Sequence, residues 1–363
     1  MECVFLKTRK KISLLVISAV MLSCVSCGQT SKVQVASGSK ETSNVATESS
    51  KADDSQEKVI EVKGDTYPLT VKDYLKDDTV IDKKPERVAV LAGTQLNIWY
   101  DLGGKSICTS NITSNVKLLS QFKDEVLKLP TVGKVNAMDM EKIISLKPDL
   151  IITQVGSQAE ESQKLKQMGF KVITTNIKGY DDVISTYKAF GKILGETQKA
   201  EQCINNLDKK KGEIISKLPE KSKSVAILYV TSKSVAVKLD NSIAGDIAKI
   251  LKLKNIASDA KPDSVGSETT PLDVEYIVAQ NPDHILVTSM IADNETAKKT
   301  MEEQFTKNPA WKGVKAISEG RVVYLPQEYF LYNAGPYFNE AIEYMARGVY
   351  PEKFGKLEEW YGK

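Results

Sequence analysis

The hydrophobic pattern of the chain alternates between short apolar runs and longer stretches with apolar residues at helical spacing. Four runs rich in Val, Ile and Leu are bounded by polar or turn residues, at 87–94, 169–176, 224–231 and 320–327. Such runs are typical of strands that are buried on both faces of a parallel sheet. Helical spacing follows the first run at 96–102, and again at 143–146. This alternation predicts an α/β fold with mostly parallel sheets.

Part of this pattern occurs twice. Residues 139–153 read DMEKIISLKPDLIIT, and residues 273–288 read DVEYIVAQNPDHILVT. At a constant offset the two stretches share Asp139/Asp273, Glu141/Glu275, Ile143/Ile277, Pro148/Pro282, Asp149/Asp283 and Ile151/Ile285. The repeat predicts two pseudo-symmetric α/β lobes, at 59–180 and 219–363. The shared prolines and aspartates are expected to be structural, because a proline keeps the residue before it out of a helix.

A helical segment is predicted between the lobes, at 181–218. Within it, residues 197–218 carry apolar side chains at three- and four-residue spacing, with Thr197 as the expected N-cap and Pro219 beyond the end. One long helix joining the lobes makes a stiff joint, so we expect little lobe closure around a ligand cleft.

The first residues are typical of a secretion signal. A basic start is followed by the apolar run 12–23, which is too short to cross a bilayer that needs about 20 residues. We assign 1–23 as signal peptide, followed by a sequence that resembles a bacterial lipobox, with Cys24 as the expected lipidated residue and Cys27 as the alternative. An ordinary secreted protein stays open. Residues 24–58 are expected to be a disordered Ser/Thr-rich tether.

The charge balance and the cysteines narrow the possible partners and the redox chemistry of the chain. Removing the signal takes four basic residues and one acidic residue from totals of 50 and 47, which leaves 46 of each. That balance argues against a nucleic-acid partner. Only Cys108, in an expected strand, and Cys203, in an expected helix, remain beyond the leader, so we expect two buried free thiols.

The order of these segments resembles the solute-binding proteins of ABC importers for iron chelates, haem and cobalamin. Further matches are PERVAVL, LPTVG, NPAWKGVKA and GRVVYL, and the resemblance covers about residues 85–350. It implies that Glu141 and Glu275 dock into arginine pockets on the two subunits of a permease dimer that works with ATPase subunits. The alternative reading is that both glutamates only favour their helix dipoles.

The same resemblance implies a monomer without intrinsic cofactor, held on the outer face of the cytoplasmic membrane by a lipid anchor, in a Gram-positive bacterium. Cobalamin binders of the family carry tryptophans where this chain has Val135 and Thr269, which disfavours a cobamide ligand. Haem binders carry a methionine and a histidine where this chain has Asn136 and Met290. Haem and cobamide therefore stay as alternatives to a siderophore.

The arginine content favours a ligand of low charge. Highly anionic ferric catecholates are usually bound by arginine clusters, but the mature chain has only Arg87, Arg321 and Arg347, the first two preceding strands on the face away from the cleft. A ferric hydroxamate suits a cleft of aromatic and small polar side chains better. Lys134 and Lys233 can supply some positive charge.

Ligands of open α/β sheets bind beyond the carboxyl ends of the strands. The side chains expected to contact the ligand are Thr94, Gln95, Asn136, Tyr229, Met290, Tyr329, Phe330, Tyr332 and Asn333.

Two other classes of protein share features of this sequence. An extracellular enzyme is disfavoured, because the chain shows no catalytic motif, no metal-ligand cluster and a single histidine, His284, inside an expected strand. We therefore expect no catalytic residue and no bound metal of the protein's own. A receptor that signals without transport would share the fold but would not need both docking glutamates.

Overall fold

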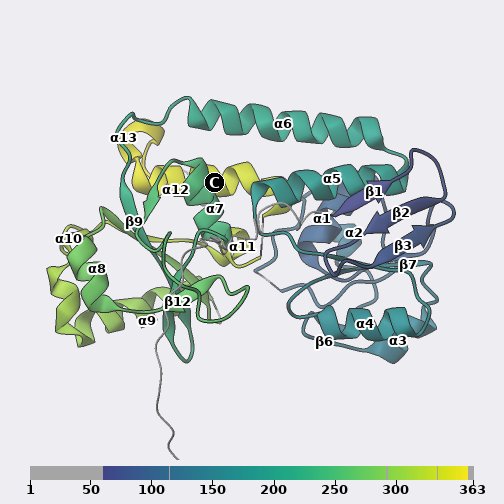
Figure 1. Ribbon diagram of the computed structural model, residues 1–363, viewed down its shortest axis with the longest axis horizontal. Coiled ribbons are helices and arrows are strands. Elements are labelled where there is room, and N and C mark those ends of the chain that lie inside the picture. Colours follow the sequence, from purple (N-terminus) through teal and green to yellow (C-terminus); the bar gives the residue numbers. More distant parts are fainter. Residues whose placement is uncertain (1–59, 114, 292, 333, 359–363) are drawn as a thin grey trace, which may run out of the picture. The chain divides into compact units, whose positions relative to one another are not determined.

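The computed structural model describes residues 60–358 except 114, 292 and 333 (Figure 1). The expected signal peptide, Cys24, Cys27 and the whole of the expected tether lie outside the described residues. Within the described residues, no helix is both long and apolar enough to span a membrane.

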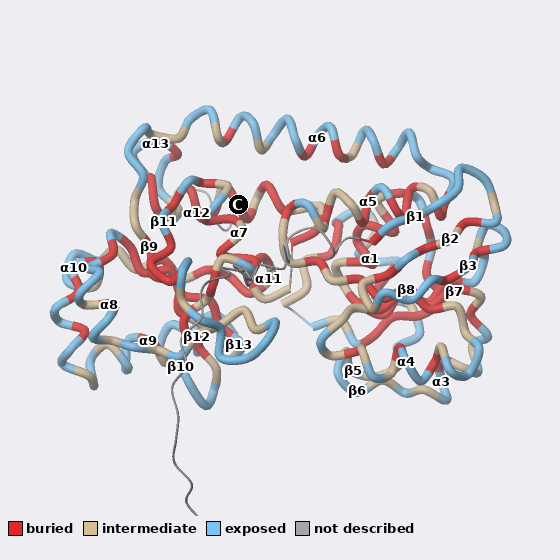
Figure 2. The backbone as a smooth tube through the Cα atoms, viewed as in Figure 1, coloured by how far each residue is buried: buried red, intermediate tan, exposed pale blue. Residues whose placement is uncertain are grey.

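The first lobe is built on a three-stranded parallel sheet in the order β4 (Val88–Val90), β7 (Leu150–Gln154), β8 (Val172–Thr175). Every residue of β4 and β8 is buried, as the continuous apolar runs predict (Figure 2). The helices of this lobe are α1 (Gly93–Asp101), α2 (Lys123–Val126), α3 (Met140–Ser145), α4 (Ala159–Gln167) and α5 (Tyr180–Leu194).

Two small antiparallel elements of the first lobe were not predicted. One is the sheet of β1 (Glu61–Lys63), β2 (Leu69–Lys72) and β3 (Asp78–Ile81), and the other is the hairpin of β5 (Gly133–Lys134) and β6 (Ala137–Met138). Their strands have four residues or fewer, and β2 buries only alternate positions. Such short strands lack the long apolar run that identified the parallel sheet.

The second lobe is built on a larger sheet in the order β12 (Thr269–Pro271), β10 (Val235–Lys238), β9 (Ser224–Thr231), β13 (His284–Met290), β14 (Val322–Tyr324), with β11 (Lys254–Asn255) also paired to β9. Strands β9, β11, β13 and β14 are parallel, whereas β10 and β12 pair antiparallel. Its helices are α7 (Ile243–Ile250), α8 (Val274–Gln280), α9 (Asn294–Lys307), η1 (Pro309–Gly313), α10 (Lys315–Ser318), α11 (Gln327–Phe330), η2 (Gly335–Tyr337), α12 (Phe338–Val349) and α13 (Pro351–Phe354). The α/β class with mostly parallel sheets is confirmed.

The linking helix is α6 (Thr197–Ile215), which packs against α5 and α12 (Figure 1). The expected N-cap is wrong by one residue: Thr197 is the first helical residue, and the N-cap is Glu196, which makes no side-chain capping bond. A threonine next to a helix start resembles a cap in sequence, but here the turn closes one residue earlier.

The joint between the lobes is more than this helix. The Lys117 ammonium of the first lobe lies 2.7 Å from a Glu340 carboxylate oxygen on α12 and donates to the Tyr329 hydroxyl at 2.6 Å. The η2 turn packs against α1, and one hydrophobic core cluster contains residues of both lobes. These contacts add to the stiffness expected from α6 alone.

The repeated aspartates have the structural role expected of them. Asp149 accepts the backbone amides of Glu86 and Arg87, at 2.7 and 3.0 Å, just before β4. Asp283 accepts the amide of Ser224 at 2.7 Å, at the start of β9. In each lobe this carboxylate ties the start of the first parallel strand, β4 or β9, to the start of the strand within the repeat, β7 or β13.

The two cysteines are free thiols, as expected, but their placement differs in part. Cys108 is fully buried and lies in a loop beside a single β-bridge at Thr109, not in a strand. Burial raises the pKa of its thiol to about 11. Cys203 is in α6 and only partly buried, and its thiol donates to the Asp101 carboxylate at 3.5 Å. The apolar residues around Cys108 resemble a strand in the sequence, although the chain forms no ladder of strand hydrogen bonds there.

Candidate functional site

Two of the expected ligand contacts, Tyr229 and Met290, come together at the carboxyl ends of β9 and β13. The Tyr229 hydroxyl donates to the Met290 sulfur at 3.1 Å, and Met290 is 57 % exposed. Burial raises the pKa of Tyr229, with smaller contributions from Glu268 and Tyr332. These side chains form one wall, soft and aromatic, at the strand ends where a ligand is expected.

Sequence reasoning missed the charged group beside this wall. The Lys238 ammonium lies 4.2 Å from the centre of the Tyr229 ring and 3.1 Å from a carboxylate oxygen of Glu268. The other oxygen of Glu268 is 2.6 Å from the ammonium of Lys178, which belongs to the first lobe. Glu268 is partly buried; burial raises its pKa and the two lysines lower it, with a net lowering. A signal for Lys238 was present in the sequence: side chains alternate between the two faces of β10, and this places Lys238 on the same sheet face as Tyr229.

On the first lobe, the expected contacts Thr94 and Gln95 open helix α1. Gln95 is buried, and its side-chain amide donates to the Thr175 hydroxyl at 2.7 Å. Thr94 lies against Gly335 of the second lobe, where a Cβ would be 3.1 Å from the threonine methyl carbon. Gly335 has φ +51°, so both its backbone conformation and this close approach favour glycine.

The other expected contacts are more scattered. Tyr329 and Phe330 are buried, and both rings pack against Tyr344. These two side chains therefore contact other protein groups and do not form an open surface. Asn136 is exposed in the turn of the β5–β6 hairpin. Asn333 lies outside the described residues. Lys134 and Lys233 are both exposed.

The three arginines of the described chain are bound to other protein groups. Arg87 donates to the carbonyl oxygens of Lys147 and Leu146, and Arg321 donates to that of Asp283. Arg347 donates to the Glu343 carboxylate on the preceding turn of α12. They therefore stabilise strand starts and a helix, as their sequence positions predicted.

Glu141 and Glu275 occupy matching positions. Each lies in the first turn of a short helix, α3 or α8, and is exposed. Each follows an aspartate N-cap, Asp139 or Asp273, whose carboxylate accepts a helix amide at 2.9 Å. The caps already satisfy the helix starts, so both glutamates are available to a partner.

His284 has the structural position that was expected. It is the first residue of β13, is 5 % exposed, and its Nδ1 has no hydrogen-bond partner among the described residues. Burial, with Lys223 and Arg321 nearby, lowers the pKa of His284 to about 4.

This lowered pKa predicts an acid-sensitive stability. Below pH 6.5 the unfolded chain binds a proton at His284 that the folded chain excludes until about pH 4, so stability falls as the pH falls through this window, by up to about 3 kcal/mol. We expect the His284→Gln variant to lose less stability than the parent between pH 6.5 and 4 in urea melts. The only imidazole of the chain gives one NMR titration; a midpoint near 6.5 in the folded protein contradicts the prediction.

Comparisons with known proteins bear on the family of this chain. The family profile described as periplasmic binding protein matches residues 88–329. The uncharacterized ABC transporter substrate-binding lipoprotein YvrC of Bacillus subtilis (strain 168) is 27 % identical over 308 residues, which cover 80 % of this chain and 88 % of that protein. The petrobactin-binding protein YclQ of the same organism is 26 % identical, with 71 % and 80 % covered.

Solved structures share the fold. An ABC transporter substrate-binding protein from Listeria monocytogenes EGD-e superposes with a TM-score of 0.65 at 21 % identity, covering 74 % of this chain and 99 % of that one. Staphylococcus aureus SirA complexed with staphyloferrin B gives 0.62 at 21 % identity, covering 77 % and 98 %. With two such lobes and a profile match over most of its folded part, this chain belongs to the periplasmic binding protein family.

Proposed function

We propose that this protein captures an iron chelate outside the cytoplasmic membrane and delivers it to the permease of an ABC importer. The observation that carries the proposal is the pair of exposed glutamates, Glu141 and Glu275, at equivalent helix starts of both lobes. A permease with two subunits needs one anion on each lobe, and arginine–carboxylate pairs fix orientation through two parallel hydrogen bonds. The names of the relatives, which include lipoproteins and a petrobactin-binding protein, support the same class.

The charge of the site supports a chelate of low net charge, such as a ferric hydroxamate. The arginines of the described chain are bound elsewhere, and Lys178 and Lys238 share the carboxylate of Glu268 beside Tyr229. The remaining wall is aromatic and thioether. Such a surface favours a ligand that makes apolar contacts and a few hydrogen bonds over a ligand with several negative charges.

The wider assembly follows from the same proposal. The protein acts as a monomer, anchored through a lipid on Cys24 or Cys27 to the outer face of the cytoplasmic membrane. Its partner is a permease dimer with ATPase subunits. It has no catalytic role.

Haem is the second candidate, because the Met290 sulfur is exposed at the strand ends and a thioether can be an axial ligand of haem iron. Cobamide binding by the same scaffold is the weaker alternative, since Val135 and Thr269 stand where tryptophans are expected.

Thermal-shift screening tests the ligand class. The chain from residue 59 is melted with ferric hydroxamates, ferric catecholates, haem and cobalamin in turn. A ligand present at 100 times its Kd stabilises the native state by about 2.7 kcal/mol, or about 5 °C for a protein of this size. We expect the largest shift with a hydroxamate; a shift with haem alone instead favours the second candidate.

A pair of methionine variants serves as the matched control for this screen. Met290 and Met168 are exposed to similar extents, 57 % and 59 %, but only Met290 lies in the wall described above. Met290→Ala should weaken the chelate that gave the shift, whereas Met168→Ala should not. Equal effects of both changes would contradict the position of the site.

A further inference from the structure

One carboxylate holds two ammonium groups beside the strand-end wall of Tyr229 and Met290. One oxygen of Glu268 lies 2.6 Å from the Lys178 ammonium of the first lobe, and the other lies 3.1 Å from the Lys238 ammonium of the second lobe. We call these three residues the bridge. The side chains of Lys178, Lys238 and Glu268 are 30 %, 15 % and 25 % exposed, so water screens their charges only in part.

The bridge carries a single net positive charge. Burial raises the pKa of Glu268, whereas Lys238 and Lys178 lower it, with a net lowering. The carboxylate is therefore ionised at neutral pH, where it cancels the charge of one of the two lysines. Without this carboxylate the wall would have two uncompensated ammonium groups beside it.

The charge of Glu268 acts on the wall. The Lys238 ammonium lies 4.2 Å from the centre of the Tyr229 ring, and the Glu268 oxygen lies 3.1 Å from that ammonium. The ring and the carboxylate are therefore closer than the Debye length, which is about 8 Å at physiological ionic strength. Burial raises the pKa of Tyr229 most, and the Glu268 carboxylate raises it further. A ligand against this ring therefore interacts with the carboxylate as well as with the lysines.

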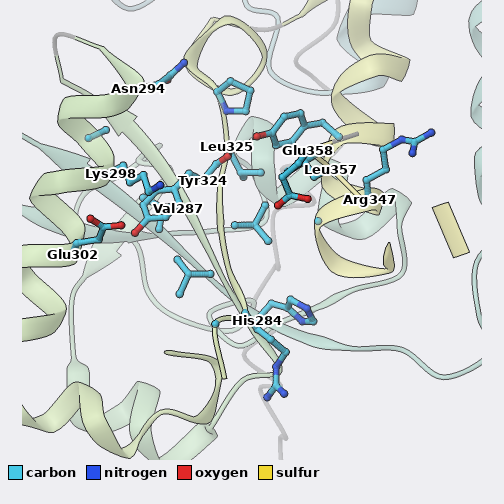
Figure 3. A pocket seen from close by; sticks show the side chains of 18 of the residues that line it. His284, Val287, Asn294, Lys298, Glu302, Tyr324, Leu325, Arg347, Leu357 and Glu358 are labelled. Atoms are coloured by element: carbon cyan, nitrogen blue, oxygen red, sulfur yellow. Dashed lines mark hydrogen bonds between the residues drawn. The ribbon is translucent and has the colours of Figure 1, made fainter. Parts of the chain in front are cut away.

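A hollow of the second lobe also gathers charged side chains, but it is separate from the wall. It has a volume of about 1320 Å³ and lies beside β14, with Lys298 and Glu302 on one side and Arg347 and Glu358 on another (Figure 3). The described residues that line it include no residue of the wall and none of the bridge. A chelate bound in this hollow would not respond to a change in the bridge, so such a change also tests where the chelate binds.

We propose, on the basis of the function proposed above, that Glu268 sets the charge preference of the site and discriminates against chelates with several negative charges. Because Glu268 cancels one lysine, the bridge attracts a neutral or weakly charged chelate without strongly attracting a ferric catecholate. Its own carboxylate also repels the catecholate. Discrimination between two ligands can depend on such a repulsive group as much as on attractive contacts.

A single charge variant tests the proposal. Ferrichrome, a ferric hydroxamate, and ferric enterobactin, a ferric catecholate, are each titrated into the parent and into Glu268→Gln, and the ratio of the two Kd values is compared. The ratio should shift toward the catecholate by at least about tenfold in Glu268→Gln, because two uncompensated ammonium groups remain beside Tyr229. Glu268→Asp keeps the charge and should keep the ratio of the parent. Both chelates are titrated into one preparation, so the ratio does not depend on the folded fraction.

A double variant separates the charge from the bond between the lobes. Lys178→Met, Glu268→Gln loses one positive and one negative charge, so it keeps the net charge of the parent but lacks the bond between the lobes. We expect it to return to the ratio of the parent. Glu340→Gln is the matched control, because Glu340 also joins the lobes, through Lys117 at 2.7 Å, but bonds to the buried Tyr329 and to no residue of the wall among the described residues. It should leave the ratio unchanged.

The outcomes distinguish this proposal from the proposed function. If the parent binds no chelate of either class, both are overturned. If the parent binds a chelate but Glu268→Gln leaves the ratio unchanged, only the role of Glu268 is overturned. A ratio that stays shifted in the double variant overturns that role as well, because the lost bond between the lobes then causes the shift. An equal shift in Glu340→Gln has the same meaning.

Discussion

Replacing Glu141 and Glu275 together by arginine should reduce chelate uptake by about 100-fold or more, with the affinity for the chelate unchanged. The change places a positive charge against each expected arginine pocket, and a lost charge pair costs about 2–5 kcal/mol when one partner stays buried. Both glutamates are exposed, so the fold should tolerate the change. Uptake is measured with a radioactive iron chelate in cells that express the variant.

The chain offers a matched control for this experiment. Asp293 caps α9, and Glu295 follows in its first turn, which is the arrangement found at Glu141 and Glu275. Glu295→Arg alters the helix dipole in the same way but removes no expected docking group. If it reduces uptake as much as either single docking variant, the glutamates act only on their helices. Full uptake by the double variant would contradict the docking role of the two glutamates.

Replacing Asp73 by alanine should destabilise the protein by about 3–5 kcal/mol, since it leaves the backbone amides of Thr174 and Leu75 without their acceptor and removes one of the two carboxylates that pair with Lys166. Asp73 is 1 % exposed; one carboxylate oxygen accepts the amide of Thr174 at 2.9 Å and lies 2.7 Å from the Lys166 ammonium. The other accepts the amide of Leu75 at 2.9 Å. One side chain therefore ties the antiparallel sheet to β8 and α4.

Urea melts measure this effect. Asp82→Ala is the control, because Asp82 also pairs with a lysine, Lys171, but is exposed, and exposed pairs contribute little. If Asp73→Ala lowers the free energy of unfolding by less than about 1 kcal/mol, the antiparallel sheet of β1 to β3 is held by its apolar contacts alone.

The sequence was sufficient for the parts of the fold that depend on long apolar patterns. Strand β9 was located with its full length, and α6 was located to within three residues at its end, because a strand of eight residues with a buried apolar run, or a helix of about five turns, leaves a strong signal. The antiparallel sheet of β1 to β3 depends on short strands and on long-range bonds such as those of Asp73. Nothing near those strands in the sequence indicates their partners.

The site was predictable only in part, for a similar reason. Tyr229 and Met290 lie at strand ends, and strand ends can be read from the apolar runs. Tyr329 and Phe330 follow the last strand as well, but whether an aromatic side chain faces a ligand or Tyr344 depends on how α11 and α12 pack. The bridge from Lys178 through Glu268 to Lys238 joins residues far apart in the chain, and charge content alone could not pair them.

The start of α5 also depends on a distant residue. The amide of Tyr180 at this start donates to the Asp246 carboxylate of α7, at 2.9 Å, while Asp182 within α5 accepts the amides of Lys178 and Gly179. A ribosome makes Tyr180 well before Asp246, so the nascent first lobe has only the local half of this cap. Full order at the start of α5 therefore waits until α7 has been synthesised and has packed against it.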